Sequence, residues 1–366
     1  MKIASIETFT DEQARLGIVR VRTDDGAEGL GEMAHNNTDI SAMVLHRQIA
    51  PLAMGADPLE AEVLSRRIIE TNYKFPGSYV CRALAGLDTA LWDLRGKVEG
   101  KSVCQLLGQR RTSVAVYGSA MRRDTKPEQE VERILKAKEW GGFRAFKLKI
   151  AKRLGHDVDE WPGRTESVVA AVRKAVGDGA TLLVDANSGY GPVRAIEVGK
   201  MLQQQGVGHF EEPCPYWELE QTAQVAAVLS IPVAGGEQDT DLAQFGRMIR
   251  MGAVDIVQPD VCYVGGLSRA LAVAQMAAEA GLPVTPHSPG GGGSMVRVFT
   301  LHYLAAIPNA GAFMEYSIEP GGQKTDLYSP ALLAREGELK VPSGPGWGVT
   351  VRTDWLAKAK RTASQS

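Results

Sequence analysis

Three short apolar runs decide the fold of this chain: LLVDAN (182–187), GHFEEP (208–213) and VAGGE (233–237). Each run carries a carboxylate at or near its end, and these carboxylates, Asp185, Glu211 and Glu237, follow one another at intervals of 26 residues. One strand, one helix and two loops have about that length. If the three strands are neighbours in a parallel barrel, the acids meet at its C-terminal rim, where barrel enzymes keep their active sites. Hard oxygen ligands favour Mg²⁺ there.

The length and the charge of the chain favour a two-part protein that acts on a small molecule. Its 366 residues are enough for a barrel of about 250 residues and a smaller partner. Lys and Arg together number 41, against 43 for Asp and Glu. No basic run with interleaved aromatic residues occurs, which argues against nucleic acid or an acidic membrane as a partner. We therefore expect a small substrate.

Cysteine usage and the N-terminus are typical of a cytoplasmic protein. The four cysteines show no CxxC spacing, and the first residues, MKIASIETFT, lack the charged and apolar regions of a secretory signal. No apolar stretch approaches the roughly 20 residues needed to span a bilayer. We expect a soluble protein of the reducing cytoplasm.

Residues 1–113 predict an α+β module. The segments IASIETFT (3–10) and GIVRVRTDDGAEGLGE (17–32) indicate strands, and Asp25-Gly26 is typical of a hairpin turn. From about residue 38 to 108 the pattern is helical. It is clearest in YVCRALAGLDTALWDLRGKVEG (79–100), where apolar residues share one face.

Residues 114–325 predict a barrel. Eight β-rich runs recur there: VAVYGS, AFKLKI, TLLVD, GHFEE, PVAGG, DIVQPD, PVTPH and AFMEY. Amphipathic stretches such as TESVVAAVRKAV (165–176) lie between them, and this alternation indicates a parallel sheet wrapped by helices. A doubly wound sheet also alternates, but eight units with acids at successive strand ends favour closure. The Pro/Gly-rich tail, residues 326–366, is expected to pack back on the first module.

Two lysines in the second barrel run, FKLKI (146–150), are candidate bases. Strand periodicity places Lys147 and Lys149 on the same face. Two ammonium groups in one barrel interior repel each other, and both repulsion and partial burial favour the neutral amine. One lysine could therefore act as a base near neutral pH. An exposed edge strand with solvated lysines is the alternative.

Three further residues at strand ends could transfer protons or stabilise developing negative charge. Asp260 ends IVQPD (256–260) and His287 ends VTPH (284–287). Adjacent strand ends bring the two together, so that the carboxylate fixes the imidazole tautomer and the other ring nitrogen moves a proton. Glu315, in FMEY (313–316), could stay protonated beside a bound anion and donate a hydrogen bond to developing negative charge. A structural histidine and a salt-bridged acid are the alternatives.

Further residues around this rim are interpreted from their positions in the strands. Glu212 follows Glu211 directly, so strand alternation sends its side chain to the other face, and Asn187 could reach the metal or the substrate. His209 lies below the ligand layer and is interpreted as structural. The three rim acids could instead cap helices or lie on the surface.

The loops that would cap the barrel are candidates for substrate binding. The first is a short turn around residues 11–15, and the second carries a polar set that could bind hydroxyls: His35, Asn36 and Asn37. Ordinary solvated turns are the alternative. SPGGGGS (288–294) lacks the lysine of a phosphate loop and is interpreted as a lid or rim loop. CPYWE (214–218) matches no particular activity.

Taken in order, FKLKI, VDAN, FEEP, GGE, QPD, the late His287 and MEY resemble the enolase superfamily, specifically its mandelate racemase subgroup (mandelate racemase/muconate lactonizing enzyme-like). The resemblance covers nearly the whole chain, including PGWGV (345–349). It implies an α/β fold: a modified TIM barrel, (β/α)7β, with an α+β capping domain built from the N-terminal segment and the C-terminal tail. It also implies Mg²⁺ held by Asp185, Glu211 and Glu237.

The resemblance further implies the chemistry of the site. The proton α to a carboxylate is removed, giving an enediolate that the metal stabilises. Lys149 would be a base on one face, and the His287–Asp260 pair an acid or base on the other. Lys147 would tune Lys149 and touch the substrate carboxylate, and Glu315 would hydrogen-bond the enediolate.

Within the subgroup, acid-sugar dehydratases are numerous, and the expected reaction is dehydration of an aldonate or aldarate to a 2-keto-3-deoxy acid in carbohydrate acid catabolism. A racemase or epimerase, or a lactone cycloisomerase, would use the same residues, and a non-catalytic binding or structural protein is a remote alternative. The resemblance favours a homo-oligomer, an octamer or a dimer. The expected substrate-binding residues are Asn187, Lys147, His35 and Asn36.

Overall fold

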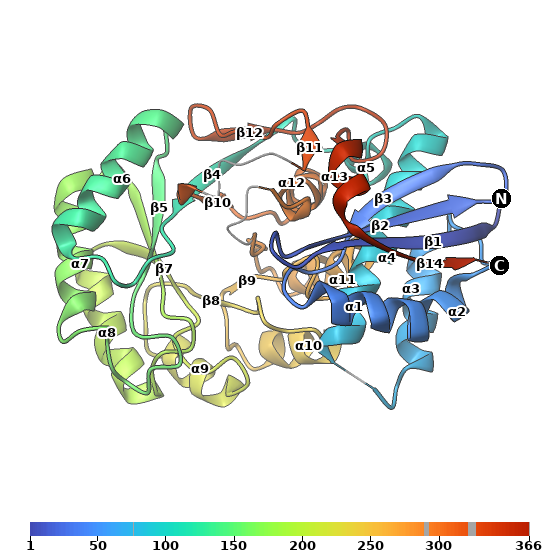
Figure 1. Cartoon of the computed structure of the whole chain (residues 1–366). Helices are drawn as coiled ribbons and strands as arrows, with labels where there is room; N and C mark the ends of the chain where they lie inside the picture. The colour runs from blue at the N-terminus through green and yellow to red at the C-terminus, as the bar shows by residue number, and fades with distance from the viewer. Residues whose placement is uncertain (76, 289–292, 321–326, 366) are drawn as a thin grey trace.

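Both ends of the chain contribute to one antiparallel sheet (Figure 1). The computed structural model describes residues 1–75, 77–288, 293–320 and 327–365. Strands β1 (Ile3–Asp11), β2 (Leu16–Thr23), β3 (Glu28–Glu32) and β14 (Lys360–Gln365) form this sheet in the order β14-β1-β2-β3. The predicted turn at Asp25-Gly26 joins β2 to β3. The sheet is the strand layer of the capping domain.

A buried carboxylate ties the two chain ends together. Glu7 of β1 accepts hydrogen bonds from Nε of Arg20 in β2 and from Nε of Arg361 in β14, both at 2.6 Å. Burial alone would raise the pKa of Glu7, but the two guanidinium groups lower it below its usual value. The last strand therefore supplies a charge partner to the first.

Helices complete the capping domain, and the longest lies directly on β3. A Cβ atom at Gly29 would lie 2.1 Å from the carbonyl oxygen of Ala90, and one at Gly31 would lie 2.3 Å from Thr89 Oγ1. Only glycine allows this approach. The helical segments are α1 (Thr38–Val44), the π-helical η1 (Leu45–Ile49), α2 (Ala50–Ala53), α3 (Ala61–Thr71), α4 (Ser78–Glu99) and α5 (Val103–Leu106).

Parallel strands wrapped by helices form the second part of the molecule (Figure 1). The strands, in the order β10-β4-β5-β6-β7-β8-β9, are β4 (Ser113–Ser119), β5 (Ala145–Lys149), β6 (Thr181–Asp185), β7 (Val207–Glu211), β8 (Val233–Gly235), β9 (Ile256–Val257) and β10 (Met314–Ser317). The helices are α6 (Pro127–Gly141), α7 (Arg164–Val176), α8 (Pro192–Gln204), α9 (Leu219–Ala226), α10 (Leu242–Arg250), α11 (Leu267–Glu279) and α12 (Val296–Ala306).

The predicted barrel is confirmed, although its seventh strand is reduced to isolated bridges. Residue Val284 bridges in parallel to Val257 on one side and to Ala310 on the other, and His287 bridges to Asp260. β10 then pairs in parallel with β4, which closes the ring. The fold is the expected (β/α)7β barrel with an α+β cap.

The tail contacts both parts of the molecule. Its segments are β11 (Tyr328–Ser329), β12 (Glu338–Lys340), β13 (Thr350–Val351) and α13 (Thr353–Lys358), followed by β14. β14 pairs with β1 in the cap, whereas β12 pairs antiparallel with β4 of the barrel. The boundaries between domains at 113/114 and 325/326 stay a prediction.

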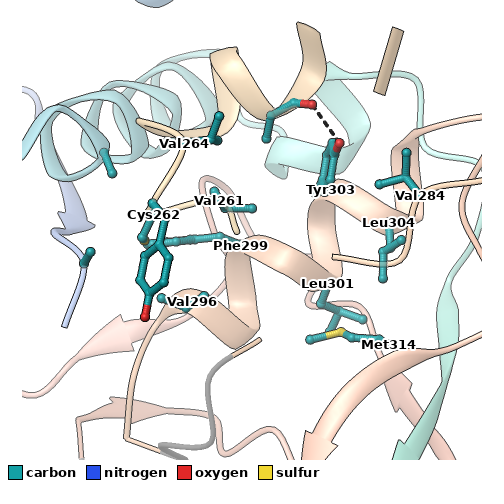
Figure 2. Packing of buried hydrophobic residues seen from close by; sticks show 14 of the residues in the cluster. Val261, Cys262, Val264, Val284, Val296, Phe299, Leu301, Tyr303, Leu304 and Met314 are labelled. Atoms are coloured by element: carbon teal, nitrogen blue, oxygen red, sulfur yellow. Dashed lines mark hydrogen bonds between the residues drawn. The ribbon is translucent and has the colours of Figure 1, made fainter. Parts of the chain in front are cut away.

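Helix α12 is buried along its whole length and packs in the interior. Figure 2 shows its apolar side chains among residues of neighbouring segments, and Tyr303 Oη donates a hydrogen bond of 2.7 Å to the carbonyl oxygen of Ala270 in α11. On α12, His302 accepts at Nδ1 from the backbone N–H of Cys104 (3.1 Å) and donates from Nε2 to the carbonyl oxygen of Trp347 (3.0 Å). One neutral imidazole thus links the barrel to α5 and the tail.

We expect His302 to make the protein less stable as the pH falls from about 6.5 to 4. Burial lowers the pKa of His302 from 6.5 to about 4, so the unfolded chain binds a proton in this window that the folded protein does not. The contribution of His302 to the free energy of unfolding is fully present above pH 6.5 and is lost as the pH falls through 4. It amounts to about 3 kcal/mol. Urea unfolding of the wild type and of His302→Gln between pH 4 and 7.5 measures it.

The free energy of unfolding of His302→Gln should be lower at pH 7 and should fall less between pH 6.5 and 4. His156→Gln, which changes an exposed histidine, should follow the wild-type curve. Parallel curves for the wild type and His302→Gln would contradict the prediction.

Within the described residues, no helix combines the length and apolar character needed to cross a bilayer.

Candidate metal centre and active site

Strand register brings three carboxylates to one end of the barrel. Lys149 of β5 lies opposite Asp185 of β6, and Asp185 lies opposite Glu211 of β7. Glu237 follows β8 by two residues. One oxygen from each of Asp185, Glu211 and Glu237 lies within 4.8 Å of the other two, and all three residues are buried. The prediction, made from their even spacing, that the three carboxylates lie together at one rim of the barrel is confirmed.

The donor set fits a hard divalent cation. Among the described residues, the buried Oε2 of Glu237 has no hydrogen-bond partner. Burial and the nearby charges of Glu211 and Asp185 raise the pKa of Glu237, so a cation bound by all three carboxylates would stabilise their ionised forms. Sites made only of oxygen ligands are typical of Mg²⁺. These residues could therefore hold the predicted metal.

Lys147 and Lys149 share a strand face as predicted, and the side-chain nitrogen of each contacts a carboxylate. Lys147 Nζ lies 2.8 Å from Glu211 Oε1 and 3.1 Å from Glu315 Oε1. Burial alone would lower the pKa of Lys147, but these carboxylates raise it well above its ordinary value. At Lys147, counter-charges from other strands therefore outweigh repulsion between the lysines, and the role of one lysine as a base stays a prediction. Lys149 Nζ contacts Asp185 Oδ2.

Asp260 and His287 form the predicted pair. His287 Nδ1 lies 2.7 Å from Asp260 Oδ2, and the backbone N–H groups of Cys262 and Tyr263 donate to Asp260 Oδ1. Burial alone would lower the pKa of His287, but Glu237 and Asp260 raise it to about 10. Its Nε2 lies 3.8 Å from Glu237 Oε2.

Glu315 accepts hydrogen bonds rather than donating them. Its Oε1 accepts from Ser119 Oγ at 2.7 Å, and its Oε2 accepts from the backbone N–H of Ser288 at 3.1 Å. Burial alone would raise the pKa of Glu315, but Lys147 and His287 lower it below the ordinary value. Cationic neighbours thus stabilise the carboxylate here, and a protonated Glu315 beside a bound anion stays a prediction.

Asn187 and Glu212 have left-handed backbones, with φ of 41° and 42°. Asn187 Nδ2 donates to Asp185 Oδ2 (3.1 Å) and to Glu212 Oε2 (3.3 Å), and Arg123 Nη2 donates to Asn187 Oδ1 (2.5 Å). Asn187 and Glu212 both line one cavity at this end of the barrel. The prediction that Glu212 points to the other face is wrong, because left-handed residues break strand alternation.

One cavity of about 610 Å³ lies over the carboxylates, between the cap and the barrel. Small-molecule sites typically have ~300–1,000 Å³. Lys149, Glu237 and His287 line its floor, which lies at the strand ends. We call the set Arg15, His35, Arg82 and Arg153 its outer wall, and the aromatic pair of CPYWE, Tyr216 and Trp217, also lines it.

Of the predicted substrate-binding residues, His35, Asn36 and Asn187 line this cavity. Lys147 does not, because Glu211 and Glu315 hold its ammonium group beneath the floor, where the residue is 1% exposed. Asn37 instead donates from Nδ2 to Tyr79 Oη at 3.0 Å.

Sequence reasoning missed several side chains at the site. Gln258 Nε2 donates to Glu211 Oε2 at 2.9 Å, and its position two residues before Asp260, on the same strand face, could have revealed it. His209, which the sequence placed below the ligand layer, was not missed; its Nε2 lies 3.6 Å from the same oxygen. Arg82 and Tyr263 also line the cavity, and no sequence signal marks them, because they meet only when the cap docks on the barrel.

Part of the glycine-rich segment falls outside the described residues, since 289–292 are not among them. After it, Ser294 Oγ and the backbone N–H of Met295 donate to the carboxylate of Glu32 at the end of β3, at 2.8 and 2.5 Å. The cap thus holds the chain just beyond this segment.

Fold and site together define an enolase-type barrel, and comparison with known families agrees. Residues 3–108 match the N-terminal domain of mandelate racemase/muconate lactonizing enzymes, and residues 129–355 match the enolase C-terminal domain-like family. The chain belongs to the mandelate racemase/muconate lactonizing enzyme family of the enolase superfamily, which confirms the resemblance inferred from its motifs.

Three similar proteins place the chain within this family. Arabinonate dehydratase of Saccharolobus solfataricus is 30% identical over 352 residues, which cover 95% of this chain and 91% of that protein. A solved structure from Roseobacter denitrificans, a candidate racemase, is 48% identical with a TM-score of 0.96, and each chain is covered completely. A mandelate racemase/muconate lactonizing protein of Paracoccus denitrificans, complexed with magnesium, is 29% identical with a TM-score of 0.90; the match covers 100% of this chain and 99% of that one.

Proposed function

We propose that the protein is a Mg²⁺-dependent hydro-lyase that converts a sugar acid, an aldonate or aldarate, into a 2-keto-3-deoxy acid. One observation carries the proposal: Lys149 and the Asp260–His287 pair flank the carboxylate cluster from two sides, on the floor of one cavity. Two such groups suit removal of a proton by one and delivery of a proton by the other. Similarity to arabinonate dehydratase supports the substrate class.

Asp185, Glu211 and Glu237 would hold the metal. When bound, Mg²⁺ would supply positive charge that stabilises negative charge developing on the substrate carboxylate. The similarity to a magnesium-bound family member supports this choice of ion. Gln258 and Asn187 donate to Glu211 and Asp185, and such contacts orient the carboxylates before a cation arrives.

The chain's own residues move the protons. Lys149 Nζ takes the α-proton, and the electrons of that C–H bond move into the substrate carboxylate. In a second step these electrons return to form the Cα–Cβ double bond as the β-carbon–oxygen bond breaks. The leaving hydroxyl takes a proton from His287 Nε2 and departs as water. Asp260 accepts from Nδ1 and holds the ring for this transfer. The enol becomes the keto acid when its hydroxyl proton moves to carbon.

The remaining residues position these groups. Lys147, held by Glu211 and Glu315, adds a fixed positive charge beneath the floor. In this proposal Glu315 keeps Lys147 in place as an anion. His35, Asn36 and Asn187 line the cavity and would bind substrate hydroxyls.

A racemase or epimerase is the second candidate. The same two groups could remove a proton on one face and return it on the other, without loss of water. The 48% identity to a candidate racemase favours this reading.

Incubation of acid sugars in D₂O with the Mg²⁺-loaded protein separates the candidates. We expect a keto acid from at least one aldonate or aldarate, and none after chelation of the metal. Keto acid is measured colorimetrically, and exchange of the α-proton is measured by NMR. Exchange without keto acid would replace dehydration with racemisation, and neither signal from any acid sugar would favour a non-catalytic protein.

We further propose a cytoplasmic homo-oligomer, a dimer or an octamer. Light scattering measures its mass.

A further inference from the structure

The cavity is lined by charged groups of both signs. Glu237 of the carboxylate cluster lines it, and so do the three arginines of the outer wall. Arg15 lies in the turn between β1 and β2, and Arg82 lies near the start of α4. Both come from the cap, while Arg153 comes from the loop after β5. A ligand in the cavity can therefore contact guanidinium groups of the cap as well as the groups at the strand ends.

Arg82 is fixed close to the reacting groups. Its Cζ lies 3.8 Å from the centre of the Tyr263 ring, and that ring lies 5.8 Å from the His287 ring. The phenol oxygen of Tyr263 lies 3.1 Å from His35 Nε2. A guanidinium stacked on an aromatic face can still use N–H groups for contact with an anion. Arg82 is thus one aromatic ring away from the proton-transfer pair.

The outer-wall arginines lack carboxylate partners. Among the described residues, no Asp or Glu oxygen lies within 4.0 Å of a guanidinium nitrogen of Arg15, Arg82 or Arg153. In contrast, Arg20 of the cap and Arg133 of the barrel each contact a buried carboxylate at 2.6 Å. Bringing a half-buried cation such as Arg82 to a cavity wall without a partner costs solvation. An anionic ligand would compensate for that loss.

His35 adds a neutral hydrogen-bonding group to the same wall. Burial above all, together with the positive charges of His287, Arg82 and Arg15, lowers the pKa of His35 to about 4. Near neutral pH the ring is uncharged, so it does not repel the arginines. It suits a hydroxyl of the ligand.

We propose that the outer wall, through Arg82 above all, binds a second anionic group of the substrate, distinct from the carboxylate that is activated. On a sugar acid this group is a terminal carboxylate, as in an aldarate, or a terminal phosphate. The inference rests on the proposed function for the position of the first carboxylate, and it narrows that function. Aldonates and lactones leave Arg15 and Arg82 without a counter-charge.

A binding experiment tests this without requiring turnover. Lys149→Met protein loaded with Mg²⁺ is titrated calorimetrically with an aldonate, an aldarate and a terminally phosphorylated aldonate of the same sugar configuration. We expect at least one doubly anionic ligand to bind roughly 10- to 100-fold more tightly than the aldonate, because a charge-assisted contact has that effect on a Kd. The tighter of the two identifies the group as carboxylate or phosphate.

Arginine variants in the same background locate the contact. Arg82→Ala should remove most of the preference while leaving aldonate affinity nearly unchanged, and that affinity also shows that the variant is folded. Arg82→Lys should restore part of the preference, since it keeps the charge but not the fork. Arg66→Ala removes the same charge from an exposed position on α3, outside the cavity, and should leave the preference intact.

Equal affinity for singly and doubly anionic ligands would overturn the proposal, as would a preference that survives in Arg82→Ala. Either result leaves keto-acid formation by the wild type untouched, so failure here is distinguishable from failure of the proposed function. Conversely, a doubly anionic ligand that binds through Arg82 but yields no keto acid would retain this site and refute dehydration.

Discussion

Replacing Lys149 by Met is expected to lower kcat for keto-acid formation by about 10²- to 10⁴-fold, the usual contribution of a general base. In the proposed mechanism Lys149 Nζ accepts the α-proton, so exchange of that proton with D₂O should fall by the same factor. Both rates can be followed by NMR on the Mg²⁺-loaded protein with a substrate found in the acid-sugar screen.

His287→Asn provides the contrasting variant. It removes the group proposed to protonate the leaving hydroxyl, so keto-acid formation should fall while exchange through Lys149 continues. Lys152→Ala changes an exposed lysine three residues after Lys149, outside the cavity lining, and should keep both wild-type rates. Wild-type exchange in Lys149→Met would show that Lys149 is not the base.

Replacing Glu237 by Gln is expected to weaken Mg²⁺ binding by at least about 10²-fold. Residues that only orient metal ligands already contribute 10- to 100-fold, and this change removes the charge of a ligand itself. Keto-acid formation at low Mg²⁺ should fall by a similar factor. The rise in Tm that Mg²⁺ gives the wild type should disappear, because that rise follows from binding to the folded state. Calorimetry and thermal unfolding measure the two effects.

Asp239→Asn is the matched control for this variant. Asp239 is a buried carboxyl group only two residues after Glu237, but it is not a member of the metal cluster. Its replacement should preserve the Mg²⁺-dependent rise in Tm. An unchanged Mg²⁺ affinity in Glu237→Gln would remove Glu237 from the ligand set.

The sequence predicted what strand period and βα spacing determine. Asp185 and Glu211 are neighbours because each ends a strand, and the same rule placed Asp260 beside His287. The rule of strand alternation failed where the backbone no longer has strand geometry. The left-handed φ of Glu212 returns its side chain to the cavity, and neither its residue type nor its position indicates this conformation.

Charge states were harder to predict than positions. The sequence argument weighed only the repulsion between the charges of Lys147 and Lys149. In the structure, Glu211 and Glu315 from other strands raise the pKa of Lys147. Contacts between the two domains also could not be predicted from the sequence. Arg82 and Tyr263 are 181 positions apart in the chain, and their stacking depends on how the cap docks, which no local pattern encodes.

The pairing of β14 with β1 constrains when the cap can be completed during synthesis. Thr10 pairs with Lys360 and Ser5 with Gln365, so one edge of β1 waits for the last residues of this sequence to leave the ribosome. Until then that edge presents unpaired backbone groups, which can pair with other strands, and Glu7 lacks Arg361. A chain that stops before residue 360 keeps this edge open permanently, and premature termination there should promote aggregation even though every residue of the proposed active site has been made.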